Sequence, residues 1–184
     1  MLRFWDRLAV WPVIAALLLG AAGIDLYFNQ SHLPGSVAAV EAQSHPATEL
    51  LDTRWHYDAQ EVRTALDAYG VAGRAAYRQF QCLDFVFMAL YGAGLALLLR
   101  RLTVGRWRWL ALLPLAVALA DLSENLMLAP LLGEGAVFAP GLAAAAGWVT
   151  TVKWGLAVAA LVGVLGATVR LGWIWVVSRR HLRD

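Results

Sequence analysis

The sequence predicts an all-α protein: a membrane-embedded, up-down bundle of four helices with a short amphipathic helix on its outer side. Composition is the first reason, because 60% of the 184 residues are hydrophobic and only 15% are charged. A soluble domain is about 45–50% apolar and about 25% charged. The composition therefore argues against a soluble domain and excludes a disordered chain. Cys82 is the single cysteine, which excludes a disulfide scaffold.

Four apolar stretches supply the second reason, because each is long enough to cross a hydrocarbon core, which needs about 20 residues of helix. We place them at residues 8–28, 80–99, 107–132 and 142–169 of a single membrane domain. The first could also be a signal peptide, since Arg3 and Arg7 precede an apolar run that ends in small residues. The run continues to Tyr27 and Phe28, which favours a span.

The third reason is that the basic residues gather on one side of such a bundle. Ten of the fifteen fall there: Arg3, Arg7, Arg100, Arg101, Arg106, Arg108, Arg170, Arg179, Arg180 and Arg183. Cytoplasmic loops carry the excess of Lys and Arg, so we expect a multi-pass protein of a bacterial cytoplasmic (inner) membrane with both termini in the cytoplasm. No basic stripe alternates with exposed aromatics, so nucleic acid is not an expected partner.

The segment 31–78 is expected on the opposite, outer side of the membrane. Pro and Gly in residues 33–46 predict a loop. Asp58 and Glu61 have the spacing of a capping box, which predicts a short helix that Gly70 ends. Its apolar face would contain Val62, Ala65, Leu66 and Tyr69. We interpret this helix as a lid on the outer membrane surface, followed by a helix that continues into the second span.

The spans contain ionisable groups, which are costly in lipid unless paired and are therefore functional candidates. Counting residues from the cytoplasmic end of each span places them at nearly one height, about 21–26 Å from the inner boundary at about 1.5 Å per residue. They are Asp25, Asp84, Asp121, Glu124 and Lys153. The sequence thus predicts a polar layer to which all four helices contribute, in which Lys153 pairs with Asp121 or Glu124.

This layer suggests roles for individual residues. Glu124 or Asp121 would donate or accept a proton beside Asp84, with Lys153 as the charge partner. Arg74 would clamp a polar headgroup. The remaining ligand-binding candidates share helix faces with these groups and are Tyr77, Tyr91, Asn125 and Asp25.

Three interpretations of the layer remain open. The first is a bundle that binds, and acts on, a membrane lipid or another lipophilic small molecule entering from the outer leaflet. The second is a structural or assembly subunit with a membrane protein partner, in which the layer only fixes helix packing. The third, proton or cation translocation, is disfavoured because the inner halves of the spans are almost purely apolar.

The same residues bear on metals and cofactors. An oxygen-only site for Ca²⁺, Mg²⁺ or Mn²⁺ is an alternative use of Asp84, Asp121, Glu124 and Asn125. The histidines lie outside the spans without metal-ligand spacing, so we predict no zinc or haem site. The sequence identifies no cofactor.

A set of spaced motifs resembles small, uncharacterised four-span bacterial integral membrane proteins. The motifs are Gly70-x-x-Gly73-Arg74-x-x-Tyr77, Asp84-x-x-Phe87-x-x-x-Tyr91, Asp121-x-x-Glu124-Asn125 and Thr150-x-x-Lys153-Trp154. The resemblance covers roughly residues 50–154 and implies a class of membrane protein, with no activity, cofactor or partner attached.

Overall fold

The computed structural model describes residues 6–133 and 135–180, and the described chain is all-helical, which confirms the predicted all-α class. The long helices are α2 (Trp11–Gln30), α4 (Ala59–Leu102), α5 (Leu112–Leu128) and α6 (Pro140–Arg180). Shorter elements are α3 (Val37–Ala42) and the 3₁₀ helices η1 (Leu51–Thr53) and η2 (Gly105–Ala111). Four helices, with η2 and α5 counted as one, are long and apolar enough to span a membrane.

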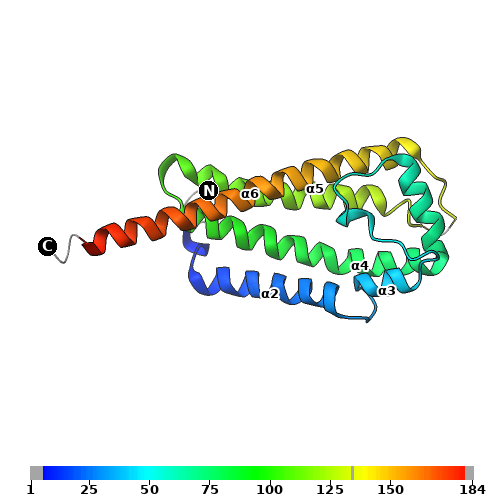
Figure 1. Ribbon diagram of the computed structural model, residues 1–184, viewed down its shortest axis with the longest axis horizontal. Coiled ribbons are helices and arrows are strands. Elements are labelled where there is room, and N and C mark those ends of the chain that lie inside the picture. Colours follow the sequence, from blue (N-terminus) through cyan, green and yellow to red (C-terminus); the bar gives the residue numbers. More distant parts are fainter. Residues whose placement is uncertain (1–5, 134, 181–184) are drawn as a thin grey trace.

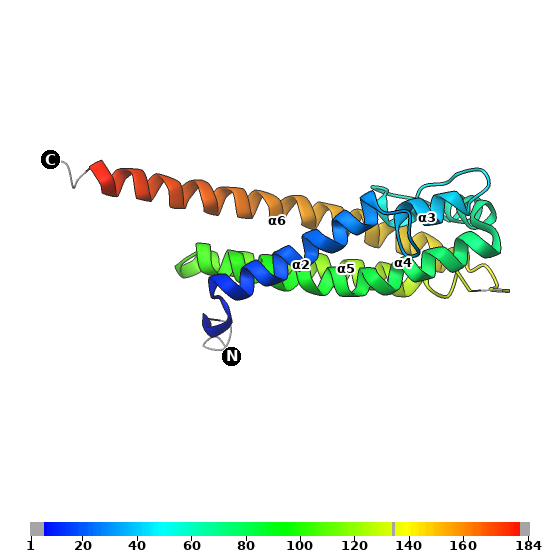
Figure 2. The ribbon, with the colours of Figure 1, turned by 90° about the horizontal axis from the view of Figure 1, so that it is seen from below.

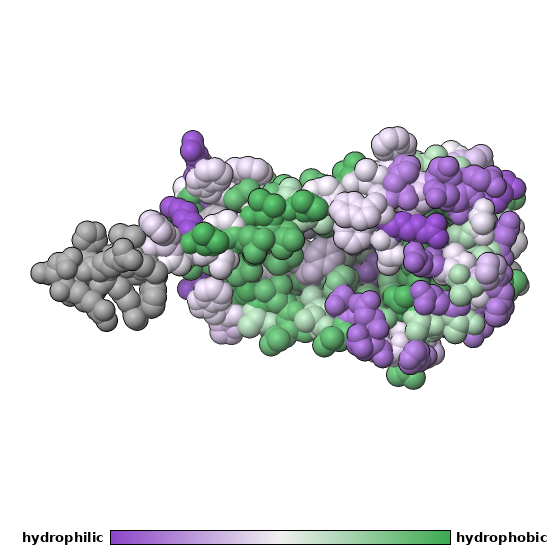
Figure 3. Space-filling view, in the orientation of Figure 1, coloured by the Kyte–Doolittle hydropathy of each residue, from purple (hydrophilic) through white to green (hydrophobic). Residues whose placement is uncertain are grey.

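The long helices lie side by side along the length of the molecule (Figure 1). α4 is central and packs against α2, α5 and α6, and α5 and α6 also pack against each other. α4 and α6 begin at the end that carries α3, and α2 and α5 finish there, while the last turns of α6 extend beyond the other helices (Figures 1 and 2). Apolar residues cover the middle of the visible face and hydrophilic residues collect at the α3 end (Figure 3).

The signals at the start of α4 act as predicted. The Asp58 side chain accepts from the Glu61 backbone N–H at 2.8 Å, and the Glu61 side chain accepts from the Asp58 N–H at 2.8 Å. Gly70 has φ +55° and interrupts the helix, a conformation that residues with a Cβ rarely adopt. The predicted apolar face is buried, through Val62, Ala65, Leu66 and Tyr69.

The predicted loop at residues 33–46 is wrong in part, because α3 lies within it. Ser36 caps this helix by accepting from the Ala39 N–H at 3.2 Å, and Val40 is fully buried in the core. Pro34 and Gly35 precede the cap and mark the turn before the helix, so they do not extend the loop through α3.

Several of the predicted cytoplasmic arginines lie together at the end opposite α3. Arg100 Nε lies 2.9 Å from Asp6 Oδ1, and Arg108 lies 3.7 Å from the other Asp6 oxygen. The hydrogen bond from Arg100 lowers the pKa of Asp6 below its ordinary value. Arg101 donates to the Ala9 carbonyl at 3.0 Å. Arg3 and Arg183 lie outside the described residues.

Residues 50–57, which we call the strap, precede the helix interpreted as a lid and make contacts that the sequence did not predict. Trp154 Nε1 donates to the Arg54 carbonyl at 2.8 Å, and His56 Nδ1 lies 2.9 Å from Thr151 Oγ1. Tyr57 is fully buried. The strap therefore lies along α6 and enters the end of the bundle.

Gly147 on α6 allows this close approach, because a Cβ there would overlap the Tyr57 carbonyl. We expect Gly147→Ala to displace the strap and lower the free energy of unfolding by about 1–3 kcal/mol, as overpacking does. Gly155→Ala is the matched control on the same helix, since its Cβ would meet nothing within 4 Å. Thermal unfolding in detergent should show Gly155→Ala at or slightly above the parent. Equal melting temperatures for the two variants would contradict this packing.

Candidate functional site

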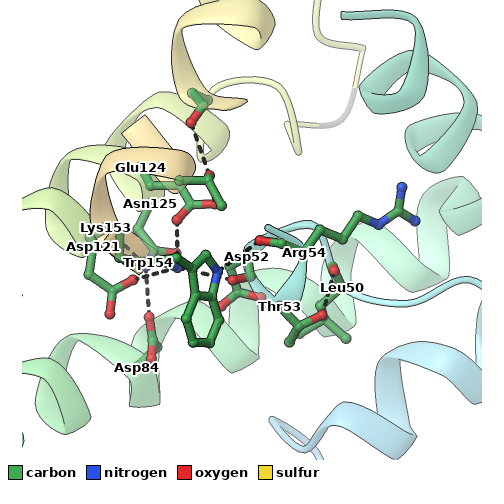
Figure 4. Close-up of polar contacts among 12 residues, drawn as sticks. Leu50, Asp52, Thr53, Arg54, Asp84, Asp121, Glu124, Asn125, Lys153 and Trp154 are labelled. Carbon is green, nitrogen blue, oxygen red and sulfur yellow. Dashed lines mark hydrogen bonds and ion pairs between the residues drawn. The ribbon is translucent and has the colours of Figure 1, made fainter. Parts of the chain in front are cut away.

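Lys153 is at the centre of a buried polar cluster formed by α4, α5, α6 and the strap (Figure 4). Its Nζ lies 2.6 Å from Glu124 Oε2 and 3.2 Å from Asp121 Oδ1, and it donates to the Asp52 carbonyl at 3.0 Å. Lys153 is 6% exposed and is the only lysine in the chain. The predicted pairing is confirmed, and it involves both carboxylates.

The cluster has two halves, and Glu124 with its donors forms the one that we call the closed half because Glu124 does not line a cavity. Glu124 is 0% exposed, and it accepts from the Tyr57 hydroxyl at 2.9 Å and from the Thr150 hydroxyl at 2.5 Å in addition to Lys153. Burial raises the pKa of Tyr57, so its hydroxyl stays protonated and remains a donor. Three donors converge on one carboxylate, which is how a buried charge is stabilised.

The other half connects α4 to α5. Tyr91 donates to Asp121 Oδ2 at 2.9 Å, and Asn125 Nδ2 donates to Asp84 Oδ2 at 2.7 Å. Gln81 Nε2 donates to Asn125 Oδ1 at 2.9 Å, which fixes the orientation of that amide. Within the part of the chain that the structure describes, Asp84 therefore accepts from a single side chain, whereas Asp121 accepts from Tyr91 and Lys153.

A cavity of about 590 Å³ lies beside this second half of the cluster, which we call the open half because Asp84 and Asp121 line the cavity. All four long helices and the strap line it, and the molecular surface is hollowed between α2 and α6 (Figure 3). Its charged lining residues are Asp25, Asp52, Asp84, Asp121 and Lys153. The wall towards the opposite end of the helices is apolar and includes Leu95, Val117, Ala157, Ala160, Leu161 and Val164. The cavity is thus polar at one end and apolar along the rest of its length.

Asp52 is a site residue that the sequence did not reveal. It is 8% exposed and lines the cavity, yet its Oδ1 is buried and has no hydrogen-bond partner among the described residues. Burial raises the pKa of Asp52 to about 7, partly offset by the charge of Lys153. No periodic pattern marks Asp52, because it lies in η1, a single 3₁₀ turn of the strap, and the strap contacts a helix about a hundred residues away. Tyr57 was missed for the same reason.

The structure brings most predicted site residues together. Asp84, Asp121, Glu124, Lys153, Tyr91 and Asn125 all belong to the cluster. Tyr77 is buried next to it, and its hydroxyl oxygen accepts from the Asp52 N–H at 3.2 Å. Asp25 lines the cavity but is exposed and lies outside the cluster, where it accepts from Asn29 Nδ2 at 3.2 Å.

Arg74 is the exception, and its predicted role as a clamp for a headgroup in this cavity is corrected. Its Nε donates to the Leu66 carbonyl at 3.0 Å, across the interruption at Gly70, and its guanidinium lies 4.0 Å from Asp67. Arg74 does not line the cavity. Helical spacing places Arg74 above Asp84, but the helix break offers a nearer carbonyl acceptor.

The carboxylates of the cluster were also candidates for a divalent cation site. Within residues 6–133 and 135–180, no group of three or more His, Cys, Asp or Glu side chains has the arrangement of a metal site. The ammonium of Lys153 lies between Asp121 and Glu124, where a bound cation would be expected.

We compared the chain with known proteins. No family model, curated protein or solved structure matches the chain. The resemblance to small four-span bacterial membrane proteins therefore stays a prediction.

Proposed function

We propose that the chain is a four-span, up-down bundle of a bacterial cytoplasmic membrane, with both termini in the cytoplasm and residues 31–78 on the outer side. The arginines near Asp6 and the exposed Trp107 and Trp109 lie at the end opposite α3, which supports this orientation. The buried cluster and the strap would then lie towards the outer leaflet.

Cysteine labelling tests the orientation in a Cys82→Ala background. An impermeant thiol reagent applied to intact cells is expected to label His32→Cys and to spare Val104→Cys, since both positions are exposed at opposite ends. Labelling after permeabilisation should then include Val104→Cys. The reverse pattern in intact cells would contradict the proposed orientation.

We further propose that the protein binds a lipophilic molecule, with its polar end at the cluster and its tail along the apolar wall. The cavity is the observation that carries this proposal, because its volume of about 590 Å³ falls within the usual range for ligand sites, about 300–1,000 Å³. Asp84 and Asp52 are the carboxylates with unused acceptor capacity at its polar end. They are the groups that would exchange a proton with a bound molecule.

A second function, a packing lock within a larger membrane complex, is favoured by Glu124 alone. Its Oε1 accepts from Tyr57 and Thr150, its Oε2 lies 2.6 Å from Lys153 Nζ, and it does not line the cavity. That half of the cluster fits a structural role. The half containing Asp52 and Asp84 faces the cavity, and a structural lock gives no reason for a carboxylate to remain there without a donor.

Filling the cavity tests binding directly. Ala157→Phe places a ring in the apolar wall, whereas Val158→Phe, one residue further along α6, is 48% exposed, lies outside the cavity and serves as the control. A photoreactive diazirine long-chain alcohol should crosslink to peptides of the cavity wall in the parent and in Val158→Phe. We expect this crosslinking to fall at least about tenfold in Ala157→Phe, since the ring leaves no room for the chain. Unchanged crosslinking in Ala157→Phe would contradict the proposed site.

A further inference from the structure

The charged groups that line the polar end of the cavity are unbalanced. Among the residues that the structure describes, four carboxylates and one ammonium line it, and neither an arginine nor a histidine does. The ammonium of Lys153 is already engaged, because it contacts Asp121, Glu124 and the Asp52 carbonyl. An anionic headgroup, such as a phosphate or a carboxylate, would therefore meet acids and no free cation.

Two of these carboxylates have few donors among the described residues. Asp52 Oδ1 is buried without a partner among the described residues, and Asp84 accepts only from Asn125. An unpaired buried acceptor carries its full desolvation cost. Asp52 Oδ1 is itself buried away from the cavity, so a ligand donor would reach Asp52 through the other carboxylate oxygen. The two groups reach the cavity from different elements, Asp52 from the strap and Asp84 from α4. A ligand headgroup at this end could contact both.

Aromatic rings surround the same space. The lining includes Phe28, Phe80, Phe87, Tyr91 and Trp154. Ring faces attract cations, so a ring that presents its face to the cavity would favour the same sign of headgroup charge as the carboxylates do.

We infer that the ligand is an amphiphile with a protonated amine headgroup, whose N–H groups donate to Asp52 and Asp84 while its alkyl tail lies along the apolar wall. This inference rests on the proposed binding function and names the ligand class. A hydroxyl headgroup could donate one hydrogen bond but would leave the surplus negative charge uncompensated. The ammonium supplies both the donors and the charge.

The test uses the detergent-solubilised full chain and three probes of one chain length: dodecylamine, dodecanol and dodecanoate. Each probe competes with the photoreactive alcohol for crosslinking to the cavity. We expect dodecylamine to compete at least about tenfold better than dodecanol, and dodecanoate to compete least, because charged hydrogen bonds are roughly twice as strong as neutral ones. The amine advantage should be lost in Asp52→Asn and in Asp84→Asn while dodecanol competes as in the parent.

Asp67→Asn is the matched control, because it removes a carboxylate whose side chain is 77% exposed and lies outside the cavity. It should leave the order of the three probes unchanged. If Asp84→Asn on the central helix α4 lowers the yield of folded protein, Asp52→Asn alone is used for the test. Asp52 lies in the strap, outside the four long helices.

The outcomes distinguish this inference from the proposed function. If dodecanol or dodecanoate competes as well as the amine, or if both Asp→Asn variants keep the amine advantage, the headgroup assignment is overturned and the site stands. If Ala157→Phe leaves the crosslinking of the photoreactive alcohol unchanged, the site itself is wrong and the assignment fails with it.

Titration gives an independent measure. Several charged or titratable groups surround the Asp52 carboxyl: Tyr57 on the strap, Lys153 on α6, Asp121 and Glu124 on α5, and Tyr69, Tyr77 and Asp84 on α4. Asp25 on α2 lines the same cavity. With a pKa of about 7, Asp52 gains its negative charge as the pH rises through neutrality, while the amine stays protonated. Competition by dodecylamine should strengthen from about pH 6 to about pH 8, and less so in Asp52→Asn. A flat profile in the parent would contradict the role of Asp52.

Discussion

Lys153→Met is expected to lower the free energy of unfolding by about 3–5 kcal/mol, the usual cost of removing one partner of a buried ion pair. The substitution leaves Asp121 and Glu124 without their shared cation and removes the donor to the Asp52 carbonyl. The strap would lose a contact with α6 in the same step. Thermal unfolding in detergent, followed by tryptophan fluorescence, measures the effect.

A compensated variant separates lost charge from lost packing. Glu124→Gln combined with Lys153→Met removes one stranded carboxylate, so the pair should be more stable than the sum of the two single changes predicts. A melting temperature within about 1 °C of the parent for Lys153→Met alone would contradict the central position of Lys153, since 1 kcal/mol corresponds to about 2–4 °C in a domain of this size.

Glu124→Gln is expected to destabilise the fold by about 2–4 kcal/mol, whereas Asp84→Asn should change the free energy of unfolding by less than about 1 kcal/mol. Glu124 accepts from Tyr57, Thr150 and Lys153, and an amide would turn a donor towards one of them. Asp84 accepts from Asn125 alone and otherwise faces the cavity.

The contrast between these two variants is the informative quantity, because both substitutions are isosteric and both remove one carboxylate from the same cluster. Unfolding midpoints measured side by side, at a pH above 7 where Asp52 is ionised, give the difference. If Glu124→Gln proved as well tolerated as Asp84→Asn, the division into a closed and an open half would be wrong.

Much of the helical framework follows from local sequence. The length of each apolar stretch predicts the four long helices, and the capping box with Gly70 predicts the start of α4 and its interruption. Counting residues along each span places Lys153 level with Asp121 and Glu124, and the ion pairs confirm that estimate. These predictions succeed because they depend on helical geometry alone.

The rest of the site depends on contacts that helical geometry does not determine. The strap bonds to α6 through residues about a hundred positions away, and it has no repeating pattern that would reveal a buried face. No sequence pattern therefore predicts Asp52 and Tyr57 as site residues, although both belong to the cluster. The prediction for Arg74 is wrong although a sequence pattern supports it. Its helical spacing points to Asp84, but the Leu66 carbonyl lies closer and accepts from Arg74 Nε.

The most direct test of ligand binding is an experimental structure of the parent protein purified in native lipid and then incubated with dodecylamine. We expect elongated non-protein density in the cavity, with its tail along Ala157, Ala160 and Leu161 and its head beside Asp52 and Asp84. A cavity closed by protein side chains, or one that holds only water between those carboxylates, would contradict this expectation.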